Sequence, residues 1–188
     1  SSVEVIKGPK ATNYGTNLGG AILLNSKQPT NESTYFRNNF TVGSYNLIKN
    51  NLQFSLKENK VTLNLHYGFL ETDGYRENNK FKREGLLLDL NYQINPKTNI
   101  GVLFNHVDYN AQIPSSLGET DFKENPTKAA FTWKSAKGYE DNKYSLGGIT
   151  LNHSFSNKIK NTTSIFYSYL DHYEPAPFGI LEEYTNGY

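Results

Sequence analysis

From Thr34 onward, apolar and polar residues alternate along the chain with a period of two. Between Val61 and Phe69, for example, the odd positions hold Val, Leu, Tyr or Phe, and the even positions hold Thr, Asn, His or Gly. Such alternation is typical of a strand with one apolar and one polar face. We therefore expect Leu65 on one face of this strand, and Asn64 and His66 on the other. The pattern recurs in about seven segments, near 34–42, 52–56, 61–69, 86–94, 100–104, 149–155 and 163–169.

The connections between these segments alternate in length. Short turns are expected at 57–60, 95–98 and 156–158, whereas a medium loop covers 71–83 and a long one covers 110–143. A further loop is expected from Asp171. After a brief first hairpin, all short turns therefore fall on one side of the sheet and all long loops on the other. This asymmetry is typical of outer-membrane barrels. The sequence thus predicts an all-β fold, an antiparallel transmembrane β-barrel, with a soluble β-sandwich as the alternative.

Two features favour the barrel over the sandwich. The polar positions are rich in Asn, Gln, Ser and Thr rather than in Lys and Glu, which suits a water-filled lumen. Aromatic residues also gather near the expected strand ends, as an interfacial girdle requires; they are Tyr67, Phe69, Tyr92, Tyr109, Tyr167 and Tyr169.

The composition excludes several other classes of protein. The 188 residues include no Cys, which removes disulfides and thiolate-ligated zinc. The formal net charge of +1 argues against a nucleic-acid partner held by phosphate contacts. No apolar run approaches the roughly 20 residues of a transmembrane helix. The four histidines lack metal-ligand spacing, and no nucleophile or acid–base constellation is present, so we expect a protein that is not an enzyme.

The first 28 residues have a different character from the alternating part. Val3, Val5 and Ile6 suggest a short strand, which Gly8-Pro9 ends. Further glycines at 15, 19 and 20 indicate tight turns or close backbone approach. They do not form a phosphate-binding loop, because no Gly-Lys-Ser/Thr sequence follows them.

This first segment resembles the end of the plug domain of TonB-dependent outer-membrane receptors. The resemblance rests on V-E-V-I-K-G-P from Val3, on Tyr14-Gly15, on L-G-G-A-I from Leu18 and on Asn25-Ser26-Lys27. In that family this signature leads directly into the first barrel strand. The stretches 73–78, 112–118 and 172–178 are similar to the ferric-citrate and ferric-siderophore branch of the family.

The resemblance implies both a domain organisation and a function. Residues 1–28 would be the C-terminal end of a plug, and 29–188 the N-terminal part of a barrel of about 22 strands. The implied function is uptake of a ferric chelate across the bacterial outer membrane, energised by the TonB complex through a region upstream of this sequence. The chelate is the transported ligand, no cofactor is implied, and the other partner is outer-membrane lipid. The alternatives are another cargo (a glycan or cobalamin), or a passive porin or surface adhesin.

Five residues are candidates for ligand binding. Arg76 and Arg83 lie in the 71–83 loop, where guanidinium groups suit the carboxylate oxygens of an anionic chelate; the alternative is a solvated loop of mixed charge. Gln112 and Trp133 belong to the long, aromatic-rich loop, which either contacts ligand or packs upon itself. By resemblance, Tyr14 lies with Asn13 and Thr16 at the plug apex, the floor of the ligand site; the alternative is that Tyr14 shapes the plug turn itself. The acidic tail, which includes Glu174 and Glu183, counts against citrate.

Overall fold

The computed structural model describes residues 2–8, 19–25 and 32–188, which belong to two compact units, Ser1–Asn31 and Glu32–Tyr188. In the first unit, β1 (Ser2–Lys7) and β2 (Gly20–Asn25) form an antiparallel pair in which Val5 lies opposite Ile22. The short strand expected around Val3–Ile6 is therefore confirmed.

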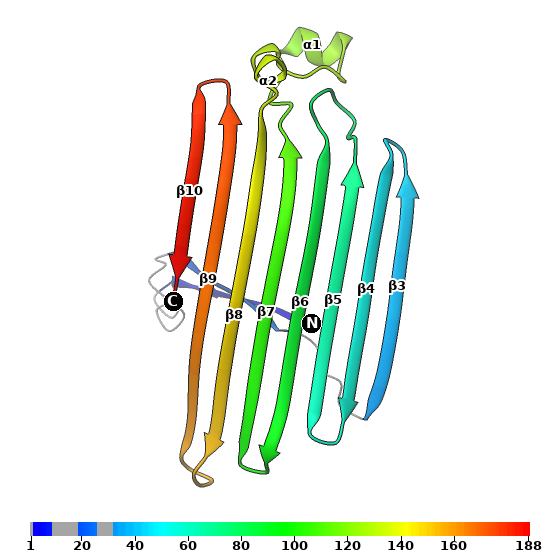
Figure 1. Ribbon diagram of the computed structural model, residues 1–188. Coiled ribbons are helices and arrows are strands. Elements are labelled where there is room, and N and C mark those ends of the chain that lie inside the picture. The colour runs from blue at the N-terminus through cyan, green and yellow to red at the C-terminus, as the bar shows by residue number, and fades with distance from the viewer. Residues whose placement is uncertain (1, 9–18, 26–31) are drawn as a thin grey trace. The chain divides into compact units, whose positions relative to one another are not determined.

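The second unit is one antiparallel sheet of eight strands, each paired with its neighbours in chain order (Figure 1). Two short helices, α1 (Glu119–Glu124) and α2 (Phe131–Ala136), lie in the connection between β7 and β8. The strands are β3 (Ser33–Gly43), β4 (Leu47–Glu58), β5 (Val61–Thr72), β6 (Phe81–Asn95), β7 (Thr98–Gln112), β8 (Tyr139–Ser154), β9 (Lys160–Ala176) and β10 (Gly179–Gly187).

The expected loop from Asp171 is wrong, because β9 continues to Ala176 and β10 returns beside it. Gly179, with φ 151°, pairs with Ala176 and closes a tight hairpin. The sheet therefore has eight strands, one more than the seven alternating segments that the sequence indicates. The pattern failed here because Glu182 and Glu183 are adjacent, so one charged residue lies on each face and the alternation is lost.

One face of the sheet is apolar over its middle. Leu65, Leu88 and Phe104 are register partners on successive strands of this apolar face. Ile165, on β9, is 76 % exposed. Among the described residues, Ala129 is the one apolar residue classed as buried, so this sheet has no core of the kind that a soluble sandwich would bury.

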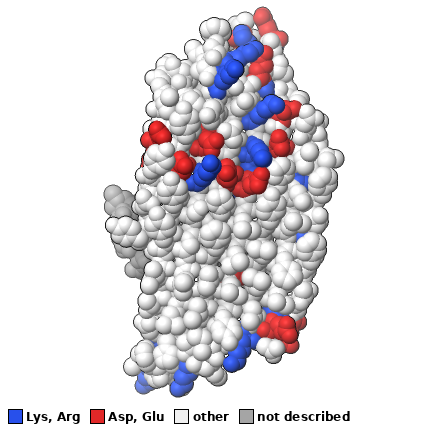
Figure 2. Space-filling model, viewed as in Figure 1, with Lys and Arg blue, Asp and Glu red and all other residues white. Residues whose placement is uncertain are grey.

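The apolar face ends at a belt of charged residues near the long loops. Glu84, Asp108, Lys143 and Asp171 lie side by side in register on β6 to β9. Figure 2 shows this belt crossing the upper part of the sheet, with a largely uncharged zone below it. An uncharged zone between charged ends is what a strand that crosses a lipid bilayer requires.

The opposite face, here called the polar face, carries Asn64 and His66 on β5, as the alternation predicted. Asn64 is only 2 % exposed and lies between Ser55 and Asp89, its register partners on β4 and β6. No helix in the described parts of the chain is long and apolar enough to cross a membrane.

Candidate functional site

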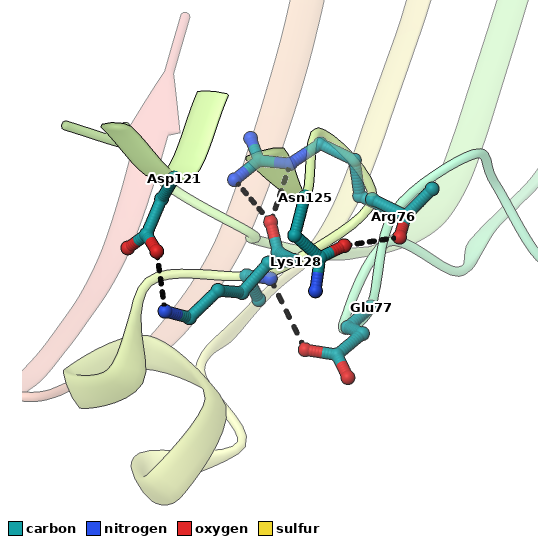
Figure 3. A network of polar contacts seen from close by, with 7 residues as sticks. Arg76, Glu77, Asp121, Asn125 and Lys128 are labelled. Atoms are coloured by element: carbon teal, nitrogen blue, oxygen red, sulfur yellow. Dashed lines mark hydrogen bonds and ion pairs between the residues drawn. The ribbon is translucent and has the colours of Figure 1, made fainter. Parts of the chain in front are cut away.

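The loops at one end of the sheet are tied together by Arg76. Its guanidinium group donates from Nη1 to the carbonyl oxygen of Ser115 at 2.6 Å, and from Nε and Nη2 to that of Lys128 at 3.0 and 2.8 Å. A longer contact of 3.4 Å reaches the carbonyl oxygen of Pro114. Arg76 lies between β5 and β6, whereas all three carbonyls belong to the connection between β7 and β8. One cation therefore binds two loops to each other (Figure 3).

The neighbours of Arg76 strengthen the same link. The Glu77 carboxylate accepts from Lys134 Nζ at 2.7 Å and from the Ala129 N–H at 3.2 Å. The Asn78 amide donates to the carbonyl oxygens of Ile113 and Gly138, each at 2.9 Å. Consecutive residues of the shorter loop thus form hydrogen bonds with polar groups along the longer one.

Within each loop, local interactions fix the backbone. Gly74 has φ 77°, and an added Cβ would overlap Asn79, so only glycine fits there. In the longer loop, Lys128 Nζ contacts Asp121 Oδ1 at 2.7 Å, which holds α1 against the segment that follows it (Figure 3). These contacts keep each loop in the conformation in which the Arg76 hydrogen bonds between the two loops form.

Gln112 and Trp133 belong to the same cluster. The Gln112 side-chain oxygen accepts from the Lys80 N–H at 3.2 Å, and the Gln112 N–H donates to the Lys80 carbonyl at 2.8 Å. The indole of Trp133 lies against Gly138 so closely that an added Cβ would overlap it. Both side chains have contacts that stabilise the loops.

Two carboxylates in the cluster are more acidic than usual. The hydrogen bond from Lys134, followed by that from the Ala129 N–H, lowers the pKa of Glu77 below its ordinary value. A hydrogen bond from Asn46, followed by one from Lys80, likewise lowers the pKa of Asp73. Both groups therefore stay ionised at neutral pH and keep their partners.

Arg83 lies in different surroundings, on the polar face of the sheet. It borders a hollow of about 310 Å³ across β3 to β7. Gly68 and Gly85 are register partners there, and because neither has a side chain, backbone forms much of the floor. The polar side chains that line the hollow are Asn39, Asn51, Gln53, His66, Arg83 and Asn105.

The charge in this hollow is positive. No Asp or Glu lines it, and Arg83 forms no ion pair with any residue that the structure describes. Arg83 is exposed, and its guanidinium group can donate several hydrogen bonds to a planar oxyanion. Arg83, unlike Arg76, is thus not occupied by backbone carbonyls, and the hollow offers an anion both charge and amide donors.

A second polar network on this face was missed by the sequence analysis. Glu140 accepts from the Tyr109 hydroxyl and from the Asn142 amide, each at 2.7 Å. His172 Nδ1 lies 2.8 Å from Asn142 Oδ1, and its Nε2 lies 3.6 Å from Glu174 Oε2. The alternation along each strand already places these residues on the same face of the sheet. Their proximity, however, depends on the register of three strands, which the sequence does not show. In the described ranges, no group of three or more His, Asp or Glu residues could hold a metal ion.

The structure thus places the predicted residues in two groups. Arg76, Gln112 and Trp133 lie together in the loop cluster, and Arg83 lies apart from them in the hollow. Tyr14, together with Asn13 and Thr16, falls outside the residues that the structure describes. Ligand contact by any of the five candidates stays a prediction.

Comparisons with known proteins add information on the fold. No family model matches the chain, and no curated protein matches it in sequence. Solved structures do match, among them the ferric-catecholate import receptor Fiu of Escherichia coli K12 in an open form and the siderophore receptor PiuA of Acinetobacter baumannii. For Fiu, the TM-score is 0.66 and the identity 20 %, over 98 % of this chain and 33 % of that one. For PiuA, the values are 0.71 and 17 %, over 92 % and 26 %.

These matches show the fold of the chain. The expected all-β, antiparallel architecture is confirmed, and the eight-stranded sheet has the fold of part of a receptor β-barrel. The chain spans about a third or less of the length of the two receptors.

Proposed function

We propose that this chain is part of a TonB-dependent receptor that imports an anionic ferric chelate, a ferric siderophore or ferric citrate, across the bacterial outer membrane. The observation that carries the proposal is the hollow around Arg83. It combines an unpaired guanidinium group with amide side chains and has no acidic lining residue. An anionic chelate that enters past the loops would meet these groups on the polar face, which lines the lumen.

The two loops that Arg76 links, between β5 and β6 and between β7 and β8, suit the extracellular opening of a receptor. Arg76 and its neighbours give the long loop a defined shape at the end of the sheet where the loops gather (Figure 1). A shaped loop loses little conformational entropy when a ligand binds, because it is already ordered. Gln112 and Trp133, which are part of this shape, are proposed to position the ligand-facing surface.

One feature of the polar face favours this reading over a passive porin. Leu103 and Phe166 flank Gly148 in register on that face, and they are 40 % and 51 % exposed. Water would be a poor neighbour for them, whereas a lumen filled by protein would cover them. Accordingly, we assign residues 1–28 to the C-terminal end of a plug and 29–188 to the barrel, with the TonB complex as the partner that acts on the plug.

The test is growth on defined iron sources. A strain that lacks the full-length gene, in a background without other receptors for the chelate, should grow poorly when an anionic ferric chelate is the only iron source. The wild-type gene should restore growth, and only in cells with an intact TonB complex. Normal growth of the deletion strain on ferric chelates, with a defect on a glycan or cobalamin instead, would assign another cargo to the same fold.

A further inference from the structure

The polar face of β3, β4 and β5 carries charge of one sign. The register joins the odd positions of β3 and β4 to the even positions of β5, so these side chains share the face of Asn64 and His66. Neither Asp nor Glu occurs at any of these positions, whereas three cations do: Arg37, Lys49 and Lys57. A face that only had to be polar would accept either sign of charge, so the exclusion of acidic side chains indicates an anionic neighbour.

The three cations are spaced along the strands from the loop end toward the short turns. Lys49 and Lys57 are eight residues apart on β4, and Arg37 lies on β3 in register with Gln53, midway between them. At about 3.3 Å per residue, each step is roughly 13 Å and the whole row about 26 Å long. The row therefore extends from the loop end of these two strands (at the right in Figure 1) almost to the turn that follows β4.

The hollow around Arg83 opens onto this row. Lys49 and Arg83 are both register partners of Leu70, so they lie at one level near the loops. Gln53, the register partner of Arg37, lines the hollow four residues deeper along β4. Arg37 thus borders the deeper end of the hollow, and from there the row continues toward the short turns.

Contacts with described residues do not neutralise the cations at the start of the row. Arg37 and Lys49 are exposed, and neither forms an ion pair with any residue that the structure describes. The guanidinium carbon of Arg37 lies 5.2 Å from the centre of the Tyr35 ring. Such a cation–π contact orients a guanidinium group and leaves its charge in place.

The acidic residues of the polar face lie away from the row. Asp89 is on β6, two strands from β4, or roughly 10 Å at about 4.8 Å per strand. Its Oδ1 accepts from the Asn91 amide at 3.0 Å. Farther along the sheet, the polar face of β8 to β10 carries three acidic residues, Glu140, Glu174 and Glu183. An anion on the polar face therefore meets attraction along β3 and β4 and repulsion along β8 to β10.

We propose that Lys49, Arg37 and Lys57, here called the cationic track, guide the anionic chelate from the hollow toward the short-turn side during import. The inference rests on the proposed function, which supplies both the anion and the direction of its movement. Each cation attracts the chelate as the preceding one releases it, so no single contact holds it too tightly to leave. The acidic side chains of β8 to β10 keep the chelate on the track by repulsion.

The first test detects an anion on the track without any chelate. Full-length receptor with Gln53→Cys as its only cysteine is treated, in cells with an intact TonB complex, with an anionic or a cationic thiol reagent. These are the sulfonatoethyl and the trimethylammonioethyl methanethiosulfonates. The ratio of the anionic to the cationic rate should be about fivefold higher than at Ser168→Cys, which lies at the same depth on β9. Arg37→Gln should remove most of this preference, and Lys160→Gln, on the polar face of β9, should leave it unchanged.

A Gln53→Cys receptor that reacts with neither reagent would overturn the proposal, because protein would then cover the track. Equal rate ratios at Gln53→Cys and Ser168→Cys would also overturn it, as would a preference that Arg37→Gln does not reduce. These outcomes concern the track alone, since none of them requires a chelate.

The second test measures uptake of iron-55, supplied as ferric citrate or as a ferric tris-catecholate. Lys57→Gln should lower the maximal uptake rate about threefold and leave the Kd for the chelate unchanged, because Lys57 lies beyond the hollow. Lys57→Arg, which keeps the charge, should restore the rate. An unchanged rate in Lys57→Gln, or a lower rate that Lys57→Arg fails to restore, would contradict the track. A wild-type receptor that imports neither probe would instead count against the proposed function.

Discussion

Arg76 and Lys128, 52 residues apart in the chain, are joined by two hydrogen bonds from the guanidinium group of the first to the carbonyl oxygen of the second. A lysine at position 76 could not form the same pair, because an ammonium group lacks the planar fork of donors. The relationship makes the 73–80 loop and the helical connection between β7 and β8 one structural unit.

Loss of this link should expose the longer loop. We expect Arg76→Ala to lower the free energy of local opening of residues 113–138 by about 2 kcal/mol, since each carbonyl that loses a charged donor loses a charge-assisted hydrogen bond. Amide hydrogen exchange of the full-length protein measures this directly. Arg83→Ala is the control, and it should leave exchange in 113–138 unchanged. Equal protection of this loop in Arg76→Ala and wild type would contradict the proposed tie.

The Glu77–Lys134 contact should make loop order depend on pH. The folded pKa of Glu77 lies below its unfolded value, so the folded state binds the proton less tightly. The stabilisation is therefore fully present above the unfolded pKa of about 4.5 and is lost as the pH falls through the folded pKa. Protease sensitivity of the longer loop should rise below about pH 4.5 in wild type. In Glu77→Gln this pH dependence should be weaker, and an unchanged profile in that variant would assign the effect to other groups, such as Asp73.

Arg83 should matter for affinity rather than for loop order. We expect Arg83→Gln to raise the Kd of the full-length receptor for an anionic ferric chelate about tenfold, the equivalent of one charge-assisted hydrogen bond. The salt dependence of binding should also decrease, because one cation is removed. Isothermal titration at two ionic strengths measures both effects. Lys158→Gln, in the exposed turn between β8 and β9, is the matched control, and an equal loss of affinity there would remove the special role of Arg83.

The two faces of β5 should differ in their tolerance of charge. Leu65→Arg should destabilise the barrel in lipid by about 2–4 kcal/mol if it lies near the midplane, whereas His66→Arg on the polar face should cost much less. His66 is the better comparison than Asn64, because Asn64 is nearly buried between neighbouring strands and an arginine there would also have to displace them. Reversible unfolding in vesicles compares the variants, and a larger loss for His66→Arg would invert the assignment of the faces.

The strand interiors were predictable because their side chains alternate strictly. In β5 the alternation from Val61 to Phe69 predicted both the strand and its two faces. It failed where charged residues occupy both faces, as at Glu182 and Glu183 in β10, because pairing there depends on the backbone and a tight turn. The strands also extend beyond their predicted ends, into segments that the sequence analysis assigned to loops. Beyond the apolar zone neither face of a strand requires apolar residues, so the alternation that predicts a strand is absent there.

The candidate site was only partly predictable. The sequence identified Arg76 and Arg83 as cations in one loop, but it could not separate their roles. Arg76 reaches carbonyls 38 to 52 residues away, and such contacts leave no local pattern. The hollow beside Arg83 depends on Gly68 and Gly85 meeting across two strands, which follows from the register rather than from either glycine alone.

The most direct test of the central claim is the uptake of a radiolabelled anionic ferric chelate by cells whose only receptor for it is the full-length protein. The account predicts energy-dependent uptake in wild type, none without the TonB complex, and a marked reduction in Arg83→Gln at low chelate concentration while the protein remains in the outer membrane at normal levels. Wild-type cells that take up no ferric chelate, or that do so equally well without the TonB complex, would contradict the account.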